Sequence, residues 1–319
     1  MKFSVILVTH NRSKFLRLAL RSLMSQSIPP DEVIIVDDAS RTPVIEDIID
    51  IADECRRHGM YIKVFRTRNE VGLGAARSLG ARMASGRYVL FMDDDAVASK
   101  RLVEAYINTF EKGRCDIVAG SCYPLYLGID SHGLPKWWDE HILGGLVAIR
   151  NDIIYLSGRA RNPADYVYGC NFAIDKRVLE AVKGFKPWLG RAKGMLLSGE
   201  EWDFVVRAID KGFHVCFSTD AVVYHLIPPS KITIDRVKRM GVGIARTRCV
   251  LAHEHVLHAT LGKYLIRCGI AALRDIAVLT IHIFLRDMPK TVKKIYDLIT
   301  HLATVLLCRD TIRRLRGSS

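Results

Sequence analysis

Short apolar runs alternate with longer amphipathic stretches over the first hundred residues of the chain. The runs with strand character, rich in β-branched and aromatic residues, are 3–9, 32–36, 61–65 and 88–92. The stretches with apolar or small residues at helical spacing are 14–25, 44–57 and 73–84. Strands that alternate with helices in this way are typical of a parallel sheet covered by helices. The pattern therefore predicts an α/β fold with a doubly wound sheet.

The pattern is less regular after residue 95. We expect a helix over 100–111, a strand over 116–122, partly helical segments at 172–181 and 201–211, and short strands at 215–217 and 221–225. Residues 124–165 are rich in Gly, Pro, Trp and charge, and they predict a long irregular insertion. Such loops in α/β proteins often form lids or walls of a binding site.

Long amphipathic stretches replace this pattern from about residue 232. In 263–286 and 290–308, charged residues recur near helical spacing beside wide apolar faces. Arg274 and Asp275 interrupt the most apolar stretch, which is therefore a poor candidate for a membrane-spanning helix. Wide apolar faces edged with Lys and Arg suit helices that lie in a membrane interface. The alternative is that these helices pack on the first domain or form a dimer.

Nearly all of the net charge lies in this tail. The 319 residues carry a formal net charge of +13, and residues 231–319 hold 17 Lys and Arg against 6 Asp and Glu. This asymmetry predicts an anionic surface as partner. Nucleic acid is disfavoured because the chain lacks interleaved aromatic and basic residues for base readout, so we expect a membrane.

Cysteine usage and the first residues indicate a cytosolic protein. The eight cysteines are scattered without a Cys-x-x-Cys pair, so we expect reduced core residues rather than a disulfide framework or zinc site. The apolar run at 3–8 is too short for a signal peptide.

Three consecutive aspartates, Asp93 to Asp95, follow the strand-like run at 88–92. In open α/β sheets the ligand crevice lies at the carboxyl ends of the strands. Two carboxylates at i and i+2 on this edge can share a divalent cation, and that cation can neutralise a diphosphate. The alternative is that Asp95 caps a following helix.

Polar side chains also follow the earlier strand-like runs. Thr9 to Arg12 follow the first, Asp37-Asp38 follow the second, and a glycine-containing stretch at 68–77 follows the third. An acidic segment occurs at 199–203, and a later apolar segment, 222–225, ends in His225. Polar groups at successive strand ends favour one shared ligand site.

Together these segments resemble the inverting family 2 glycosyltransferases, which have the GT-A fold. The resemblance covers about 1–230 and rests on five segments: Ser-Val-Ile-Leu-Val-Thr-His-Asn-Arg, Val-Asp-Asp-Ala-Ser, Asn-Glu-Val-Gly-Leu-Gly-Ala-Ala-Arg, Asp93–Asp95 and Gly-Glu-Glu-Trp-Asp. It implies a catalytic domain at 1–230 with a Rossmann-like mixed sheet flanked by helices. Residues 1–98 would form its nucleotide-binding half and 99–230 its acceptor-binding half, followed by the basic amphipathic helical tail at 231–319.

The resemblance also implies a set of donor-binding residues. Asp38 would accept hydrogen bonds from the nucleobase, and Asp93 would contact ribose or the waters of a metal. The other expected donor contacts are Thr9, Asn11, Arg12, Arg68, Asn69 and Arg77. Arg77 is equally compatible with a solvated or ion-paired surface position on its helix. Residues 190–194 resemble a basic loop that closes over the diphosphate.

The metal and the base follow from the same resemblance. Asp95, supported by Asp93, would ligate Mg²⁺ or Mn²⁺, with His225 as a further metal or diphosphate ligand. The family's usual base is the second acid of a Glu-Asp pair, and this chain has Glu201 at that position. Because Glu is longer than Asp, the choice between Glu201, Glu200 and Asp203 stays open. Acids in a first helical turn are also favoured by the helix dipole alone.

The expected activity is transfer of a sugar from a nucleotide-sugar donor to a hydroxyl of a glycan, glycolipid or polysaccharide by direct displacement. We expect a cytoplasmic protein that is peripheral on the inner, anionic face of the cell membrane, near a lipid-linked acceptor, and able to oligomerise through its C-terminal helices. One alternative is a non-catalytic sugar-nucleotide-binding scaffold. The other is a sugar nucleotidyltransferase, although those enzymes have a Gly-rich, Arg-containing loop where this chain has Thr9–Arg12.

Overall fold

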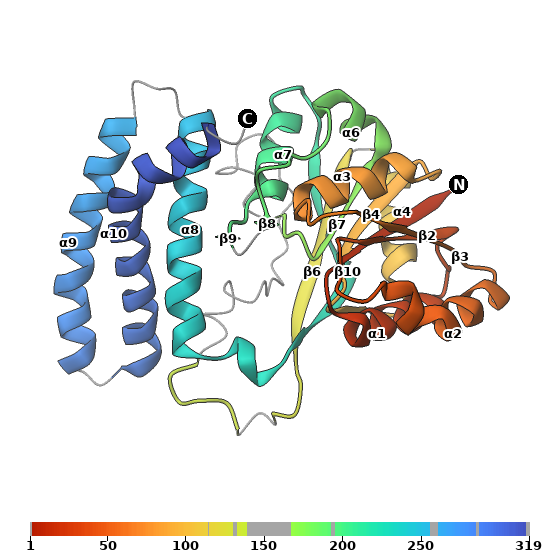
Figure 1. Ribbon diagram of the computed structural model, residues 1–319, viewed down its shortest axis with the longest axis horizontal. Helices are drawn as coiled ribbons and strands as arrows, with labels where there is room; N and C mark the ends of the chain where they lie inside the picture. The colour runs from red at the N-terminus through yellow and green to blue at the C-terminus, as the bar shows by residue number, and fades with distance from the viewer. Residues whose placement is uncertain are drawn as a thin grey trace. The chain divides into compact units, whose positions relative to one another are not determined.

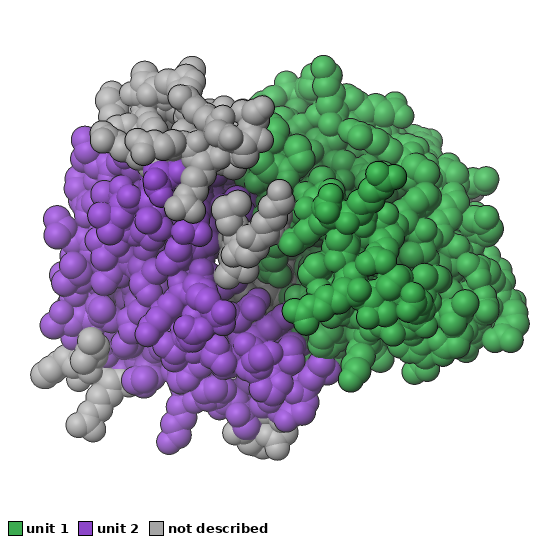
Figure 2. Space-filling view, in the orientation of Figure 1, with its two compact units in different colours: residues 1–125, 148–193, 200–226 green, residues 126–147, 194–199, 227–319 purple. Residues whose placement is uncertain are grey.

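The computed structural model describes residues 2–113, 115–129, 133–138, 167–192, 195–255, 261–284 and 287–316. The chain divides into two compact units, drawn in different colours in Figure 2. Unit 1 consists of residues 1–125, 148–193 and 200–226, and unit 2 of residues 126–147, 194–199 and 227–319. Most of the insertion predicted over 124–165 lies outside the described residues.

An eight-stranded sheet forms the centre of unit 1 (Figure 1). Its strands, in the order in which they lie side by side, are β3 (Tyr61–Arg66), β2 (Glu32–Asp37), β1 (Phe3–Thr9), β4 (Tyr88–Asp93), β7 (Asn171–Asp175), β6 (Ile117–Tyr126), β10 (Val215–Ile227) and β5 (Ala96–Ala98). The first four pair in parallel, whereas β7 is antiparallel to β4 and β6, and β5 is antiparallel to β10. The sheet is therefore mixed.

Helices cover both faces of this sheet because its central strands are apolar on both sides. The helices of unit 1 are α1 (Ser13–Met24), α2 (Val44–Arg57), α3 (Leu73–Met83), α4 (Leu102–Glu111), α6 (Lys176–Val182) and α7 (Glu200–Ile209). Val5 and Leu7 of β1 pack in one core cluster with α1, α2 and α4, while Ile6 packs in the other with α3, α6 and α7. Strands buried on both faces read as continuous apolar runs, as the sequence pattern predicted.

The structure sharpens two of the predicted segments and adds one strand. The segment predicted as partly helical at 172–181 is helical from Lys176, in α6, while residues 171–175 form β7, which pairs with β4 and β6. The two short strands expected at 215–217 and 221–225 are one strand, β10. Strand β5 was not predicted. Short apolar segments have no periodicity that separates strand from helix, so their partners decide.

A disulfide between Cys115 and Cys216 contradicts the prediction that all cysteines are reduced. The two residues are 101 positions apart in sequence. Cys115 lies just before β6 and Cys216 lies in β10, and these strands are neighbours in the sheet. The pair therefore forms through sheet topology, which cysteine spacing does not reveal. The free cysteines are 55, 122, 170, 249, 268 and 308, all of them buried.

The described part of unit 2 contains three long helices, α8 (Ile234–His255), α9 (Leu261–Phe284) and α10 (Met288–Arg316). Helix α10 packs against both α8 and α9, and it lies between them (Figure 1). These elements confirm the predicted helical extension. Unit 2 also contains the short 3₁₀ helix η3 (Pro229–Lys231), and the short strands β8 (Arg191–Ala192) and β9 (Met195–Leu196) precede α7. Across the described residues, no helix combines the length and apolarity needed to cross a membrane.

Candidate active site

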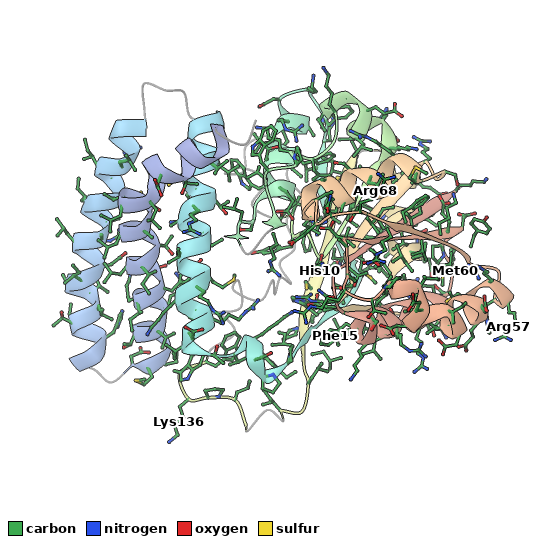
Figure 3. The ribbon with its side chains drawn as sticks, in the orientation of Figure 1. His10, Phe15, Arg57, Met60, Arg68 and Lys136 are labelled. Carbon is green, nitrogen blue, oxygen red and sulfur yellow. A yellow bond between two sulfur atoms is a disulfide. The ribbon has the colours of Figure 1, made fainter. Side chains whose placement is uncertain are left out.

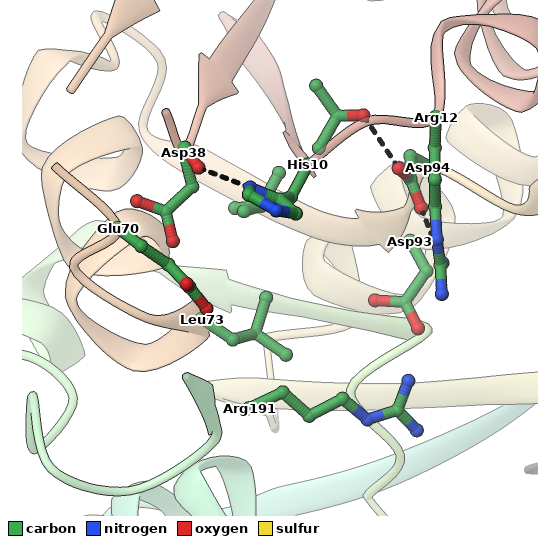
Figure 4. A pocket seen from close by; sticks show the side chains of 10 residues that line it. His10, Arg12, Asp38, Glu70, Leu73, Asp93, Asp94 and Arg191 are labelled. Carbon is green, nitrogen blue, oxygen red and sulfur yellow. Dashed lines mark hydrogen bonds and ion pairs between the residues drawn. The ribbon is translucent and has the colours of Figure 1, made fainter. Parts of the chain in front are cut away.

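A pocket of about 230 Å³ lies at the carboxyl ends of β1, β2 and β4 in unit 1 (Figure 4). Its lining residues are Val8, Thr9, His10, Arg12, Asp38, Glu70, Leu73, Asp93, Asp94 and Arg191. Parallel strands bring their carboxyl ends to one edge, so polar groups that are far apart in sequence meet there. This is the edge at which the sequence predicted a ligand crevice.

Asp94 and Asp95 occupy the turn between β4 and β5, where Arg12 and Thr9 hold them. Thr9 donates its hydroxyl to Asp94 Oδ2 at 2.7 Å, and Arg12 Nη1 donates to Asp94 Oδ1 at 3.2 Å and to Asp95 Oδ2 at 2.9 Å. Burial, followed by the charge of Asp95, raises the pKa of Asp94 to about 7. The residues after Asp95 form a strand, so the helix-capping alternative is wrong.

The second acidic feature is a group of three side chains that could hold a metal ion: Asp93, Asp95 and His225. Strand β10 pairs antiparallel with β5, which places His225 opposite Ala96, and the backbone N–H of Leu226 donates to the Asp95 carbonyl at 2.8 Å. His225 Nε2 consequently lies 3.2 Å from Asp95 Oδ1.

One ligand atom from each of the three residues lies within 4.8 Å of the others. Asp95 and His225 are buried, whereas the side chain of Asp93 is 31% exposed toward the pocket it lines. Two carboxylates and an imidazole are ligands that suit Mn²⁺, and carboxylates suit Mg²⁺. The residues present therefore fit a divalent cation.

Arg77 is buried beneath the site and connects it to α7. Its side chain is 3% exposed. Nη1 donates to Glu200 Oε1 at 2.7 Å, and Nη2 donates to Asp93 Oδ1 at 2.9 Å and to the Gly169 carbonyl at 2.7 Å. A Cβ at Gly169 would come within 2.7 Å of Arg77 Nη2, so the glycine leaves room for the guanidinium. Burial opposes the charge of Arg77, but Glu200 and Asp93 outweigh it and raise the pKa of Arg77. The structure thus shows a buried ion pair instead of a surface one.

The three candidate bases differ in what they contact. Asp203 is fully buried, with Oδ1 3.0 Å from Lys186 Nζ and Oδ2 2.8 Å from Arg207 Nη2. Glu200 gives Oε1 to Arg77, while its buried Oε2 has no hydrogen-bond partner. The buried Oε2 of Glu201 also has none.

The environment of Glu201 favours its protonated form. Burial and then the charge of Glu200 raise the pKa of Glu201 to about 8, although Arg77 acts in the opposite direction. A carboxyl group with a pKa near neutrality is suited to accept a proton during a reaction. Glu201 therefore remains a candidate for the general base.

Asp38 lines the pocket and also holds the loop before α3. Its Oδ1 accepts from the Val71 N–H at 2.8 Å and the Thr67 hydroxyl at 3.0 Å, and its Oδ2 accepts from the Gly72 N–H at 2.9 Å. Gly72 has φ +89°, a conformation that favours glycine. The motif that suggested nucleobase binding therefore also fixes the backbone beside the pocket.

Four predicted donor contacts do not line the pocket: Arg77, whose buried contacts are given above, and Arg68, Asn69 and Asn11. Arg68 and Asn69 are exposed in the loop after β3, and Arg68 is labelled in Figure 3. Asn11 is exposed, and its side chain bonds to His10 and to the N–H of Arg41.

Arg191 lies in the basic loop that the sequence predicted at 190–194, and Asp94 was singled out without a role. Sequence reasoning did not select four of the lining residues: Val8, His10, Glu70 and Leu73. The His10 ring lies in the pocket, with Nδ1 2.6 Å from the Asp38 carbonyl and Nε2 2.7 Å from Asn11 Nδ2 (Figure 4). All four lie in or beside segments that the sequence did single out. Periodicity cannot tell which loop side chain points inward, so only the folded backbone identifies them.

A family comparison agrees with this arrangement. Residues 4–182, more than half of the chain, match the model of glycosyl transferase family 2. The chain belongs to this family. Among characterised relatives, it is 29% identical over 129 residues to a cholesterol galactosyltransferase of Borreliella burgdorferi, covering 40% of this chain and 35% of the relative. It is 31% identical over 140 residues to a poly(ribitol-phosphate) beta-glucosyltransferase of Bacillus spizizenii, covering 43% of this chain and 21% of the relative. The matches thus span about a third or less of these relatives.

Solved structures of this family and of related transferases share the fold. Residues 1–349 of Staphylococcus aureus TarS, in complex with UDP, superpose with a TM-score of 0.52 at 17% identity, covering 97% of this chain and 92% of that one. The mannosyltransferase PcManGT from Pyrobaculum calidifontis, in complex with GDP-Man and Mn²⁺, gives a TM-score of 0.61 at 15% identity, covering 95% and 87%. The predicted GT-A fold is confirmed.

Proposed function

We propose that this protein is a metal-dependent inverting glycosyltransferase that uses a nucleotide-sugar donor and a hydroxyl acceptor. One observation carries the proposal: a group that could hold a metal ion, Asp93, Asp95 and His225, is linked to the acids at the start of α7. The link is Arg77, which donates buried hydrogen bonds to both Asp93 and Glu200, the neighbour of Glu201. The UDP and GDP-Man bound in structures of the same fold support a nucleoside diphosphate sugar as donor.

The donor half of the site would bind the nucleotide and its diphosphate. Thr9, His10 and Asp38 line the part of the pocket between β1 and β2, where the nucleoside would lie. Arg12 and Arg191 supply positive charge to the same pocket for phosphate oxygens. Asp93, Asp95 and His225 would hold Mn²⁺ or Mg²⁺, which supplies positive charge against the charge that develops on the departing diphosphate.

The base half would activate the acceptor. Glu201 takes the proton of the acceptor hydroxyl as the oxygen attacks the anomeric carbon. The new bond joins that oxygen to the anomeric carbon, and the bond to the diphosphate oxygen breaks on the opposite face, so the configuration inverts. Glu200, held by Arg77, lies beside it, and the charge of Glu200 helps to raise the pKa of Glu201.

The acceptor in this proposal is a glycan, glycolipid or polysaccharide hydroxyl, presented at the inner face of an anionic membrane. The excess of positive charge in residues 231–319 supports this location. A homo-oligomer formed through the C-terminal helices is compatible with the same surface chemistry.

Substitution of Asp95 tests the proposal. We expect Mn²⁺ to raise the melting temperature of the wild-type protein, and Asp95→Asn to lose this shift together with at least about 100-fold of donor turnover. Asp53→Asn is the matched control, since Asp53 is an exposed acid paired with Arg56. Turnover would be followed as release of nucleoside diphosphate from uridine, guanosine and thymidine diphosphate sugars. Full activity of Asp95→Asn in the presence of chelator would contradict the metal role.

A further inference from the structure

Helix α9 has an inverted polarity: large apolar side chains face solvent and its acid faces the protein. The exposed apolar residues are Ile266 (64%), Ile270 (63%), Leu273 (70%), Ile276 (48%) and Ile281 (55%). Residues 266, 270, 273 and 281 recur at helical spacing, so they form one continuous stripe along the helix. We define this stripe, with Ile276 at its edge, as the outer face of α9. A stripe of this size on a soluble helix indicates a partner.

The opposite face fixes the orientation of the helix. Asp275 is fully buried against α10, where Lys294 Nζ donates to Oδ1 at 2.9 Å and His301 Nδ1 lies 2.7 Å from Oδ2. Burial opposes the ionisation of Asp275, but the hydrogen bonds from Lys294 and His301 lower its pKa. Rotating α9 to hide its isoleucines would break these ion pairs and leave charges without partners. The exposure of the outer face is therefore a stable property of the hairpin.

The exposed charged side chains that the structure describes on α9 have one sign. Arg267 and Arg274 are exposed along one border of the stripe, and the side chain of Arg274 is 68% accessible. The sequence of α9 contains a single acid, Asp275, which is buried. Arg274 Nη2 lies 3.8 Å from Asp275 Oδ1, but this carboxylate is buried and also binds Lys294 and His301. The surface that α9 presents is thus apolar and positive, and α9 adds no exposed carboxylate to it.

We propose that the outer face of α9 docks on the surface of an anionic lipid bilayer. In such a bilayer the acyl chains can contact the isoleucine and leucine side chains, and the phosphate groups above them can bind the arginines at the border of the stripe. A pair of copies joined through this face would instead add a second set of arginines and no exposed acid from α9. The helix lies in the interface instead of crossing it, in line with the limited apolarity of the described helices. This inference rests on the membrane location in the proposed function and names the surface responsible.

Vesicle binding by the full chain tests the inference. Wild-type protein should sediment with vesicles of equal parts phosphatidylglycerol and phosphatidylcholine, and far less with phosphatidylcholine alone. The double variant Ile270→Gln plus Leu273→Gln should lower partitioning by about tenfold or more, since each side chain loses its apolar contact. Arg267→Gln should lower it about fivefold on the anionic vesicles only. Ile49→Gln, at a 56% exposed position on α2, is the matched control and should bind as wild type.

A second readout keeps the test independent of folding and of activity. The tryptophan emission of Ile270→Trp should shift to shorter wavelength on anionic vesicles, and that of Ile49→Trp should not. Absent vesicle binding by wild type, or equal binding by the double variant, would overturn the inference. The inference would also be overturned if the wild-type protein did not bind vesicles but formed a dimer, seen by light scattering, that the double variant lost. Donor turnover without vesicles reports separately on the proposed transfer reaction.

Discussion

Replacing Arg77 with methionine should lower the free energy of unfolding of the protein by about 3 kcal/mol. Methionine fills a similar volume but leaves Glu200 Oε1, Asp93 Oδ1 and the Gly169 carbonyl without their donors. Breaking a buried ion pair by removing one partner costs roughly 3–5 kcal/mol. Asp93 is 31% exposed and water can take over part of its interaction, so the lower end of that range applies.

Urea unfolding followed by tryptophan fluorescence and circular dichroism would measure this loss. Arg101→Met is the control, because Arg101 forms an exposed pair with Glu104 on α4 and its loss should cost less than about 1 kcal/mol. The double variant Arg77→Met plus Glu200→Gln should recover at least about 1 kcal/mol, since it removes the charge left behind. If Arg77→Met unfolds at the same urea concentration as Arg101→Met, Arg77 does not carry the connection between β4 and α7.

Two further groups of predictions concern the pH dependence that Glu201 causes and the stability of two glycine-to-alanine variants. Because the pKa of Glu201 is raised to about 8, the rate of sugar transfer from the donor should increase as pH rises through about 8. Glu201→Gln should abolish this transfer, whereas the control Asp53→Asn should keep the pH profile of the wild-type enzyme. The folded state retains the Glu201 proton from the ordinary value of 4.5 up to about 8, so this group lowers the free energy of unfolding as pH rises through that window. Glu201→Gln should flatten that slope in urea titrations; an unchanged slope would disprove the raised pKa. Gly120→Ala should cost about 1–3 kcal/mol or more, because its Cβ would clash with Asn171, the Ala221 carbonyl and the Tyr106 hydroxyl. Gly269→Ala, with open space around the new atom on α9, should instead be neutral or stabilise by up to about 1 kcal/mol in the same measurement.

Local patterns were sufficient for most of unit 1. The apolar runs that became β1, β2, β3 and β4 are continuous because helices cover both faces of the sheet, and the acids and polar groups follow them because strand ends are where the chain turns toward solvent. The resemblance to family 2 glycosyltransferases placed Thr9, Arg12, Asp38 and Asp93 at one edge, where they line the pocket.

Long-range pairing decided what local patterns left open. Residues 171–175 became a strand because β4 and β6 flank them, and Cys115 met Cys216 because β6 and β10 are neighbours. The same topology brought His225 to Asp95 across 130 positions. None of these contacts has a periodic signature, since each depends on which strand lies next to which.

The sequence by itself thus determined the fold class, the family, the acidic strand ends and the basic, amphipathic tail. Residue type and spacing are sufficient to indicate these features, because strands and helices have different periodicities and charge depends on residue type alone. Only the tertiary structure decided that Arg77 is buried between Asp93 and Glu200, and that Asp275 turns inward while the isoleucines of α9 turn outward. Burial and ionisation depend on the partners that surround a side chain, and those partners come together only when the chain has folded.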